Sequence, residues 1–366
     1  MAHAGSAGTG GAGLAGGAAG GTTAAAGAGN GGTGGAQNGG VGGISGGGGI
    51  ASAGGGSGGG ATCPKPAGQI CHEFYANDNS RNELHHVNEF EPAKSWVVKV
   101  GDTGANSARG IQLVDNQQAK TKQAVLVSVD KGFVEFDVVD GAELNRVNAF
   151  GSVTSALRVP SDATTQLPAG TTILARDLAP SELDFVDSKG VSVAPAAKLG
   201  FAGGTEIRKL ERNPANGNLT FTKYESDTAA YVYEVTEQGS LLAKLKLPVG
   251  SKGYNALWRD GGNLLAASGS PCTILSLDSK GTVLGTLGGK NQFPAAGGGF
   301  IFSDVFSGIQ LLPNGNVVVA NWLGHVDASK HADTPELLEI SAENQLVWSW
   351  GNQAAAALIT YGYVVR

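Results

Sequence analysis

The chain has 366 residues, a formal net charge of −6 and 60 glycines. No cluster of Lys and Arg accompanies this acidic balance, which argues against nucleic acid or an anionic membrane as the main partner. No apolar run is long enough to span a bilayer, and the first residues lack the basic and apolar regions of a signal peptide.

Residues 1–61 consist almost entirely of small uncharged residues, and no charged residue precedes Lys65. Such a segment has no large side chains to bury, so burial cannot offset the conformational entropy lost on folding. We therefore predict a disordered Gly/Ala-rich tether over residues 1–61 and one folded domain over residues 62–366.

The tether resembles the uncharged stalks that follow the lipidated cysteine of bacterial surface lipoproteins. The resemblance implies an extracellular or cell-surface protein whose export signal is not visible in this sequence; a cytosolic location is the alternative. Cys63 and Cys71 are close in sequence, and an oxidising compartment favours a disulfide between them. Cys272 lies in an apolar strand and is expected to be a buried small hydrophobe rather than a nucleophile.

Short apolar runs separated by turns predict β-strands throughout the folded part. The first three, residues 70–75, 83–90 and 95–100, precede five four-stranded units. These units begin near residues 108, 155, 205, 253 and 306, at a spacing of about 46 to 53 residues that suits propeller blades. The clearest unit spans residues 306–351, and its turn Pro313–Asn316 has a counterpart in residues 215–218.

The pieces left over at the two ends of the folded part complement one another. Residues 357–365 form a predicted first strand with nothing after it, whereas residues 70–100 supply second, third and fourth strands without a first. Together they complete a sixth blade, and closing a ring in this way removes an open sheet edge. The sequence thus predicts an all-β, six-bladed β-propeller of four-stranded antiparallel blades.

The segment Leu311–Asn316 (LLPNGN), followed by residues 337–341 and 346–348, resembles the repeats of bacterial secreted propellers labelled quinoprotein-like, NHL-like or WD40-like. The likeness covers residues 65–366 and identifies a type of repeat, not an activity. Quinoprotein dehydrogenases have eight blades and, in many members, an adjacent Cys pair. This chain has six predicted blades and no adjacent cysteines, so the resemblance does not extend to their cofactor.

Two long loops of the 306–351 unit interrupt the regular repeat. They are residues 288–306, before its first strand, and residues 323–334, between its second and third strands. Propeller geometry places both on one face, and function usually lies in irregular loops on a regular scaffold. We expect this face to be the binding surface.

Polar residues near the starts of the first strands form one candidate site at the channel mouth. We expect a ligand-binding set of Arg109, Arg158, Arg208, Glu206, Asn255, Asp304, Trp322 and His325. Arginine side chains suit an anionic or polyhydroxy ligand, and Trp322 offers a ring for stacking. The alternative is that these residues hydrate the channel, satisfy backbone groups or, for Trp322, belong to the core.

A second candidate site lies within the long loop of residues 323–334. His325, Asp327, His331 and Asp333 are ligand types that suit zinc or another borderline divalent metal. The alternative is a polar surface loop, since the spacing matches no helical or zinc-finger pattern. His85 and His86 are expected to point to opposite faces of their strand.

The leading functional hypothesis is a monomeric binding module that recognises a glycan, a small molecule or a protein. No catalytic serine elbow, HExxH motif or phosphate-binding loop is present in the sequence. The alternatives are an enzyme (a lyase, hydrolase or metal-assisted transferase) with its site at the channel mouth, and a purely structural surface protein.

Overall fold

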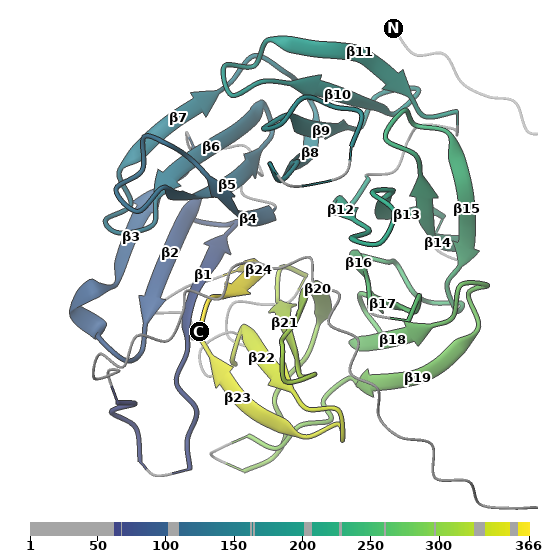
Figure 1. Cartoon of the computed structure of the whole chain (residues 1–366). Helices are drawn as coiled ribbons and strands as arrows, with labels where there is room; N and C mark the ends of the chain where they lie inside the picture. The colour runs from purple at the N-terminus through teal and green to yellow at the C-terminus, as the bar shows by residue number, and fades with distance from the viewer. Residues whose placement is uncertain are drawn as a thin grey trace, which may run out of the picture. The chain divides into compact units, whose positions relative to one another are not determined.

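The structure is a computed structural model that describes residues 62–66, 68–101, 110–161, 163, 165–200, 207–226, 229–259, 261–295, 298–325, 334–351 and 358–366. The predicted tether, residues 1–61, lies outside them. The described residues form six four-stranded antiparallel sheets arranged as the blades of a β-propeller (Figure 1). This confirms the predicted fold. No helix in the described part is long and apolar enough to cross a membrane.

Five blades are formed by consecutive strands. Blade 1 contains β4 (Gly110–Asp115), β5 (Gln123–Val129), β6 (Gly132–Asp137) and β7 (Glu143–Val147). Blade 2 contains β8 (Val153–Arg158), β9 (Thr172–Arg176), β10 (Glu182–Val186) and β11 (Ser192–Lys198). Blade 3 contains β12 (Glu211–Arg212), β13 (Leu219–Ser226), β14 (Ala229–Val235) and β15 (Leu241–Lys246). Blade 4 contains β16 (Asn255–Trp258), β17 (Leu264–Ala267), β18 (Thr273–Leu277) and β19 (Val283–Gly288). Blade 5 contains β20 (Val305–Leu311), β21 (Val317–Trp322), β22 (Leu337–Ile340) and β23 (Leu346–Trp350).

The sixth blade joins the two ends of the folded part. Its strands are β24 (Ile359–Val364), β1 (Glu73–Asp78), β2 (Glu83–Asn88) and β3 (Trp96–Lys99), in that order, with the 3-10 helix η1 (Pro92–Lys94) before β3. Figure 1 shows β24, from the end of the chain, beside β1. The prediction of a blade shared between the two ends is confirmed, and so is the Cys63–Cys71 disulfide just before it.

The predicted Asn-Gly turns connect the first and second strands of blades 3 and 5. In blade 5 the Gly315 amide donates to Leu312 O at 2.9 Å, and in blade 3 the Gly217 amide donates to Asn213 O at the same distance. Both glycines have positive φ, 87° and 79°, a conformation that glycine adopts without steric cost. The Asn-Gly pair thus marks both turns in the sequence, although the blade 3 loop, closed between Asn213 and Asn218, is one residue longer than the blade 5 loop, closed between Leu312 and Asn316.

Six clusters of buried apolar side chains hold neighbouring blades together, one cluster for each pair of adjacent blades. Phe74 and Ala76 of blade 6, for example, pack with Trp348 and Leu337 of blade 5. The second strands are almost entirely buried, whereas the fourth strands alternate or face solvent, as in β15 and β19. Burial between blades therefore explains the apolar runs from which the strands were predicted.

Candidate functional site

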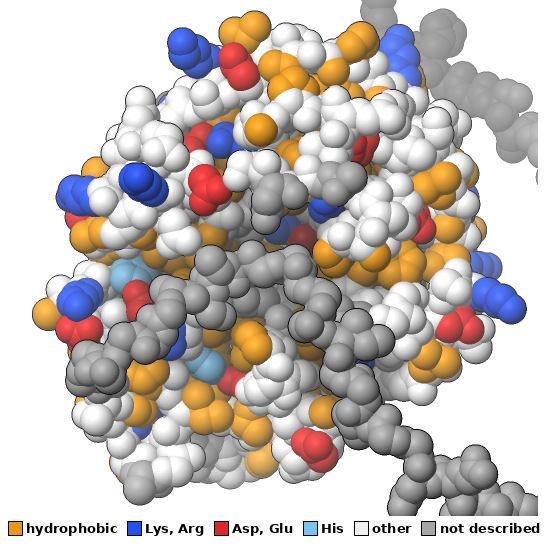
Figure 2. Space-filling view, in the orientation of Figure 1, with side chains coloured by type: hydrophobic (Ala, Val, Ile, Leu, Met, Phe, Trp, Pro, Cys, Tyr) orange, Lys and Arg blue, Asp and Glu red, His pale blue; other side chains and the backbone are white. Residues whose placement is uncertain are grey.

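A cavity of about 310 Å³ opens at one mouth of the ring, and we call it the mouth pocket. Its described lining residues are Asn79, Thr154, Ile207, Arg208, Lys209, Tyr254, Ser307, Gly308, Trp322, His325, Thr360 and Tyr361. Figure 2 shows basic and acidic side chains close together in the hollow at the centre of this view. None of the described residues lining the mouth pocket is acidic, although Glu211 lies beside Lys209 and Asp304 lies beside His325.

The blade architecture gathers these residues from distant parts of the chain. Thr154, Tyr254 and Tyr361 lie near the starts of first strands, whereas Asn79 and Trp322 lie where second strands end. In an antiparallel blade these ends share one face. The lining therefore belongs to the face on which the sequence places the two long loops of the 306–351 unit.

Lys209 forms the floor of the mouth pocket. Its ammonium lies 4.2 Å from the centre of the Tyr361 ring and donates to Ile111 O at 3.2 Å. Glu211 Oε1 is 3.4 Å from the same ammonium. Burial raises the pKa of the Tyr361 phenol, which keeps it protonated as a donor to Ile309 O at 3.4 Å. These contacts link blades 1, 3, 5 and 6 across the channel.

Arg208 and Tyr254 form one wall of the mouth pocket. The guanidinium carbon lies 4.4 Å from the centre of the Tyr254 ring, a cation–π arrangement that holds the positive charge beside an aromatic face. The Arg208 amide donates to Thr222 O at 2.9 Å, which anchors the residue to the second strand of blade 3. The predicted position of Arg208 at the channel mouth agrees with this geometry.

Trp322 and His325 form the opposite wall, and Asp304 contacts His325 from outside the lining. The His325 ring stands edge-on to Trp322, with 4.7 Å between ring centres, and its Nδ1 is 3.6 Å from Asp304 Oδ2. Asp304 Oδ2 also accepts the His325 amide at 3.2 Å. These contacts join the two long loops and confirm that they lie side by side. Trp322 Nε1 is buried and has no hydrogen-bond partner in the described part of the chain.

Asn255 and Arg158 do not line the mouth pocket, and both are buried. Asn255 is fully buried, donates to Glu211 at 3.4 Å and accepts the Ile309 amide at 3.1 Å. The predicted position of Arg158 at the start of a first strand is wrong, because Arg158 is the last residue of β8. It lies at the other end of its blade, where it pairs with buried Glu135 at 2.7 Å.

Five predicted site residues lie outside the described residues: Arg109, Glu206, Asp327, His331 and Asp333. The metal site proposed from the sequence therefore stays a prediction, with His325 as its one described member. His325 contacts Asp304, which belongs with it to the predicted ligand-binding set.

Lys209, Tyr254 and Tyr361 line the mouth pocket but were missing from the predicted set. A signal for them exists in the sequence, because each lies within a few residues of a first-strand start, as Arg208 does. Position alone does not show which of these side chains reach the channel.

Cys272 is buried as expected, but it lies just before β18 with φ of 55° and not within the strand, and the two adjacent histidines point to opposite faces as expected. Cys272 is a buried free thiol, and burial raises its pKa to about 12, which favours the protonated thiol over the nucleophilic thiolate. His86 stacks on Tyr75, whereas His85 stands edge-on to Trp350 of blade 5. His86 also lines a cavity with Gln123 and Val138 on the side of blade 1, so the two imidazoles face different neighbouring blades, as the strand alternation predicts.

Comparison with known proteins establishes the fold and no family. No protein-family model and no curated protein sequence matches the chain. A crystal structure of a Bacteroides caccae protein of unknown function is similar, with a TM-score of 0.62 and 18% identity, over 81% of this chain and 100% of that one. A streptogramin B lyase structure matches with a TM-score of 0.48 and 10% identity, over 78% and 85% of the two chains. The dihydro-heme d1 dehydrogenase NirN gives 0.40 and 11%, over 76% and 63%. At 18% identity, the similarity to the Bacteroides caccae protein shows a shared fold alone.

Proposed function

We propose that this protein is an exported binding propeller that takes a small organic anion carrying an aromatic ring into the mouth pocket. The observation that carries the proposal is the composition of the described lining: Arg208 and Lys209 supply positive charge, three aromatic side chains supply flat surfaces, and no residue is acidic. A carboxylate or phosphate would meet cationic donors, and a ring would meet aromatic faces.

The donor groups around the mouth pocket add to this argument. Trp322 Nε1 is a buried donor without a hydrogen-bond partner in the described structure, and a buried donor of this kind costs free energy until an acceptor reaches it. An anion supplies only acceptors. The pocket volume of about 310 Å³ lies at the lower end of the range for small-molecule sites.

Export is supported by the disulfide between Cys63 and Cys71. Disulfides persist mainly in oxidising compartments outside the cytosol. The uncharged segment before Lys65 suits a spacer between the propeller and an attachment point. The bond therefore favours the extracellular or cell-surface location over the cytosolic alternative.

The test is a thermal-shift and calorimetric screen of the full chain against aromatic carboxylates, aliphatic carboxylates and neutral sugars. Aromatic carboxylates should raise the melting temperature most, because only they use both the cations and the rings. The variant Arg208→Gln should weaken binding of the best of them by about tenfold to a hundredfold, since a charge-assisted hydrogen bond contributes about 1.5–3 kcal/mol.

Lys246→Gln is the matched control, because Lys246 is exposed on the outer strand of the same blade. It removes the same unit of charge far from the mouth pocket and should leave affinity unchanged. Preferential binding of neutral sugars, or equal losses in both variants, would contradict the proposal.

An enzyme is the second candidate, and the His325–Asp304 pair favours it. Asp304 Oδ2 lies near Nδ1 of a half-exposed imidazole, an arrangement that orients histidine as a general acid or base. If this function holds, a bound anion is turned over and His325→Ala abolishes turnover while the melting temperature stays nearly unchanged. Binding without turnover in the wild-type protein supports the binding module.

A further inference from the structure

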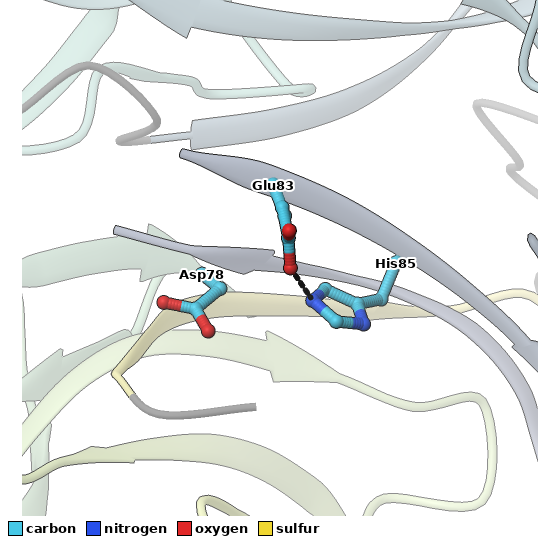
Figure 3. Close-up of side chains that lie close together, drawn as sticks. All are labelled: Asp78, Glu83 and His85. Carbon is cyan, nitrogen blue, oxygen red and sulfur yellow. Dashed lines mark ion pairs between the residues drawn. The ribbon is translucent and has the colours of Figure 1, made fainter. Parts of the chain in front are cut away.

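The hairpin between β1 and β2 brings Asp78, Glu83 and His85 together at one end of blade 6 (Figure 3). Asp78 and Glu83 are direct cross-strand partners, and His85 follows Glu83 by two positions on β2. Cross-strand partners, and residues two apart in a strand, project from the same face of a sheet. One ligand atom from each side chain lies within 4.8 Å of the others.

The three side chains are withdrawn from solvent to different degrees. The side chain of Asp78 is 0% exposed, that of His85 5% and that of Glu83 17%. Two carboxylates directly opposite each other in an antiparallel pair repel one another. Lys99 contacts Glu83 at 2.8 Å and Arg81 lies 3.8 Å from Asp78, and the side chains of these two cations are 64% and 34% exposed. Asp78 Oδ1 also accepts hydrogen bonds from the Ser80 amide and hydroxyl and from the Arg81 amide.

The imidazole of His85 is the second observation that points to a ligand. Its Nε2 is buried and makes no hydrogen bond of acceptable geometry in the described structure, although it lies 3.3 Å from Glu83 Oε2. The edge of the ring therefore faces the two carboxylates, and Figure 3 shows Nε2 paired with Glu83 as an ion pair that lacks hydrogen-bond geometry. A buried imidazole nitrogen in this position can serve as a ligand atom for a cation.

A third carboxylate approaches from blade 5. Glu336 is completely buried; its Oε2 accepts the Ile359 amide at 2.8 Å, whereas Oε1 has no hydrogen-bond partner among the described groups. Ile359 is the β24 partner of Asp78 in the sheet. Glu336 therefore lies beside the same corner of blade 6.

We propose that Asp78, Glu83 and His85 form a binding site for a divalent transition metal of the zinc class, with Glu336 as a neighbouring carboxylate. One imidazole nitrogen and carboxylate oxygens are the ligand set that zinc, cobalt(II) and manganese(II) accept. Bond lengths near 2 Å require the ligand atoms to move closer together, which side-chain rotation at a hairpin end allows.

The position of the site indicates its role. It lies where β24 and β1 meet, next to Asn79 of the mouth pocket and against blade 5. A metal here would cross-link the corner at which the two ends of the chain close the ring. Because the folded protein binds the ion and the unfolded chain does not hold these ligands together, metal binding stabilises the closed propeller.

The experiment uses the full chain, first treated with a chelator and then dialysed. Cobalt(II) chloride is titrated while visible absorption is recorded, and zinc chloride is titrated by calorimetry. The wild-type protein should bind one ion per chain and melt at a higher temperature with the ion. His85→Gln and Glu83→Gln should each weaken binding by at least about tenfold.

Two control variants distinguish this site from the other histidines. His86→Gln changes the next residue, which faces blade 1, and His325→Gln changes the loop implicated by the sequence; both should retain the ion. Circular dichroism checks that each variant is folded, and Glu83→Gln, at the more exposed position, serves if His85→Gln does not fold. The proposal is overturned if the wild-type protein binds neither ion, if His85→Gln and Glu83→Gln bind normally, or if only His325→Gln loses the ion.

Discussion

At the residue scale, charged groups near the channel divide into those held by other blades and those facing the cavity. Arg158 donates to Glu135 of blade 1 at 2.7 Å and to Thr172 of its own blade at 2.6 Å. Glu135 also accepts from Asn116 and Asn145. Each charge in this buried network is compensated, which identifies Arg158 as a residue that joins blades 1 and 2.

Replacing Arg158 by Met should lower the free energy of unfolding by about 3 kcal/mol, because it leaves the Glu135 carboxylate buried without its cation. Denaturant unfolding followed by circular dichroism measures the change. Lys189→Met, at an exposed turn of the same blade, should stay within about 0.5 kcal/mol of wild type. An Arg158→Met protein with normal stability and lost anion binding would return Arg158 to the ligand-binding set.

At the scale of elements, β20 packs closely against β24 because residue 308 is a glycine. A Cβ added at Gly308 would lie 2.0 Å from Tyr361 Cδ2 and 2.9 Å from Thr360 O. The Tyr361 ring occupies that space and forms the floor of the mouth pocket together with Lys209. The close approach of these two strands therefore also positions the site.

Gly308→Ala should destabilise the protein by about 1–3 kcal/mol, the usual cost of overpacking a tight contact. Gly285 in β19 is the matched control, because a Cβ there meets nothing within 4 Å. Gly285→Ala should leave stability unchanged or raise it by less than about 1 kcal/mol. Thermal melting of both variants tests the pair, and equal melting temperatures would show that β20 and β24 can separate without cost.

At the scale of the whole molecule, β24 closes the ring of blades. Ile359, Tyr361 and Val364 are buried between blades 5 and 6 or 6 and 1, and β24 covers the inner edge of β1. Burying each such side chain contributes about 1.5–3 kcal/mol. The sum is comparable with the total stability of an ordinary domain.

Deleting residues 358–366 should therefore give a protein that is unfolded or aggregated at 25 °C, with the β1 edge exposed. Size-exclusion chromatography and circular dichroism provide the measurement. Val365→Ser, which changes a side chain that is 46% exposed just after β24, should remain a folded protein. A truncated chain that elutes and melts like wild type would show that five blades and a partial sixth are sufficient.

The sequence by itself determined the fold of the described propeller. Its apolar runs, its Asn-Gly turns at Pro313–Asn316 and 215–218, and its complementary end pieces are local signals, because a strand or turn is specified by residues within a few positions of one another. The two long loops were also visible, so the face carrying His325 and Trp322 was predicted from the same pattern.

Only the tertiary structure decided which side chains meet. Arg158 was placed at the wrong end of β8 because a shift of a few residues in a strand boundary moves a side chain to the opposite face of the ring. Tyr361 and Lys209 meet because the chain closes on itself, and Asp78 opposes Glu83 because of the register of one hairpin. Contacts between segments so far apart in the chain depend on strand register and ring closure, which local patterns do not specify.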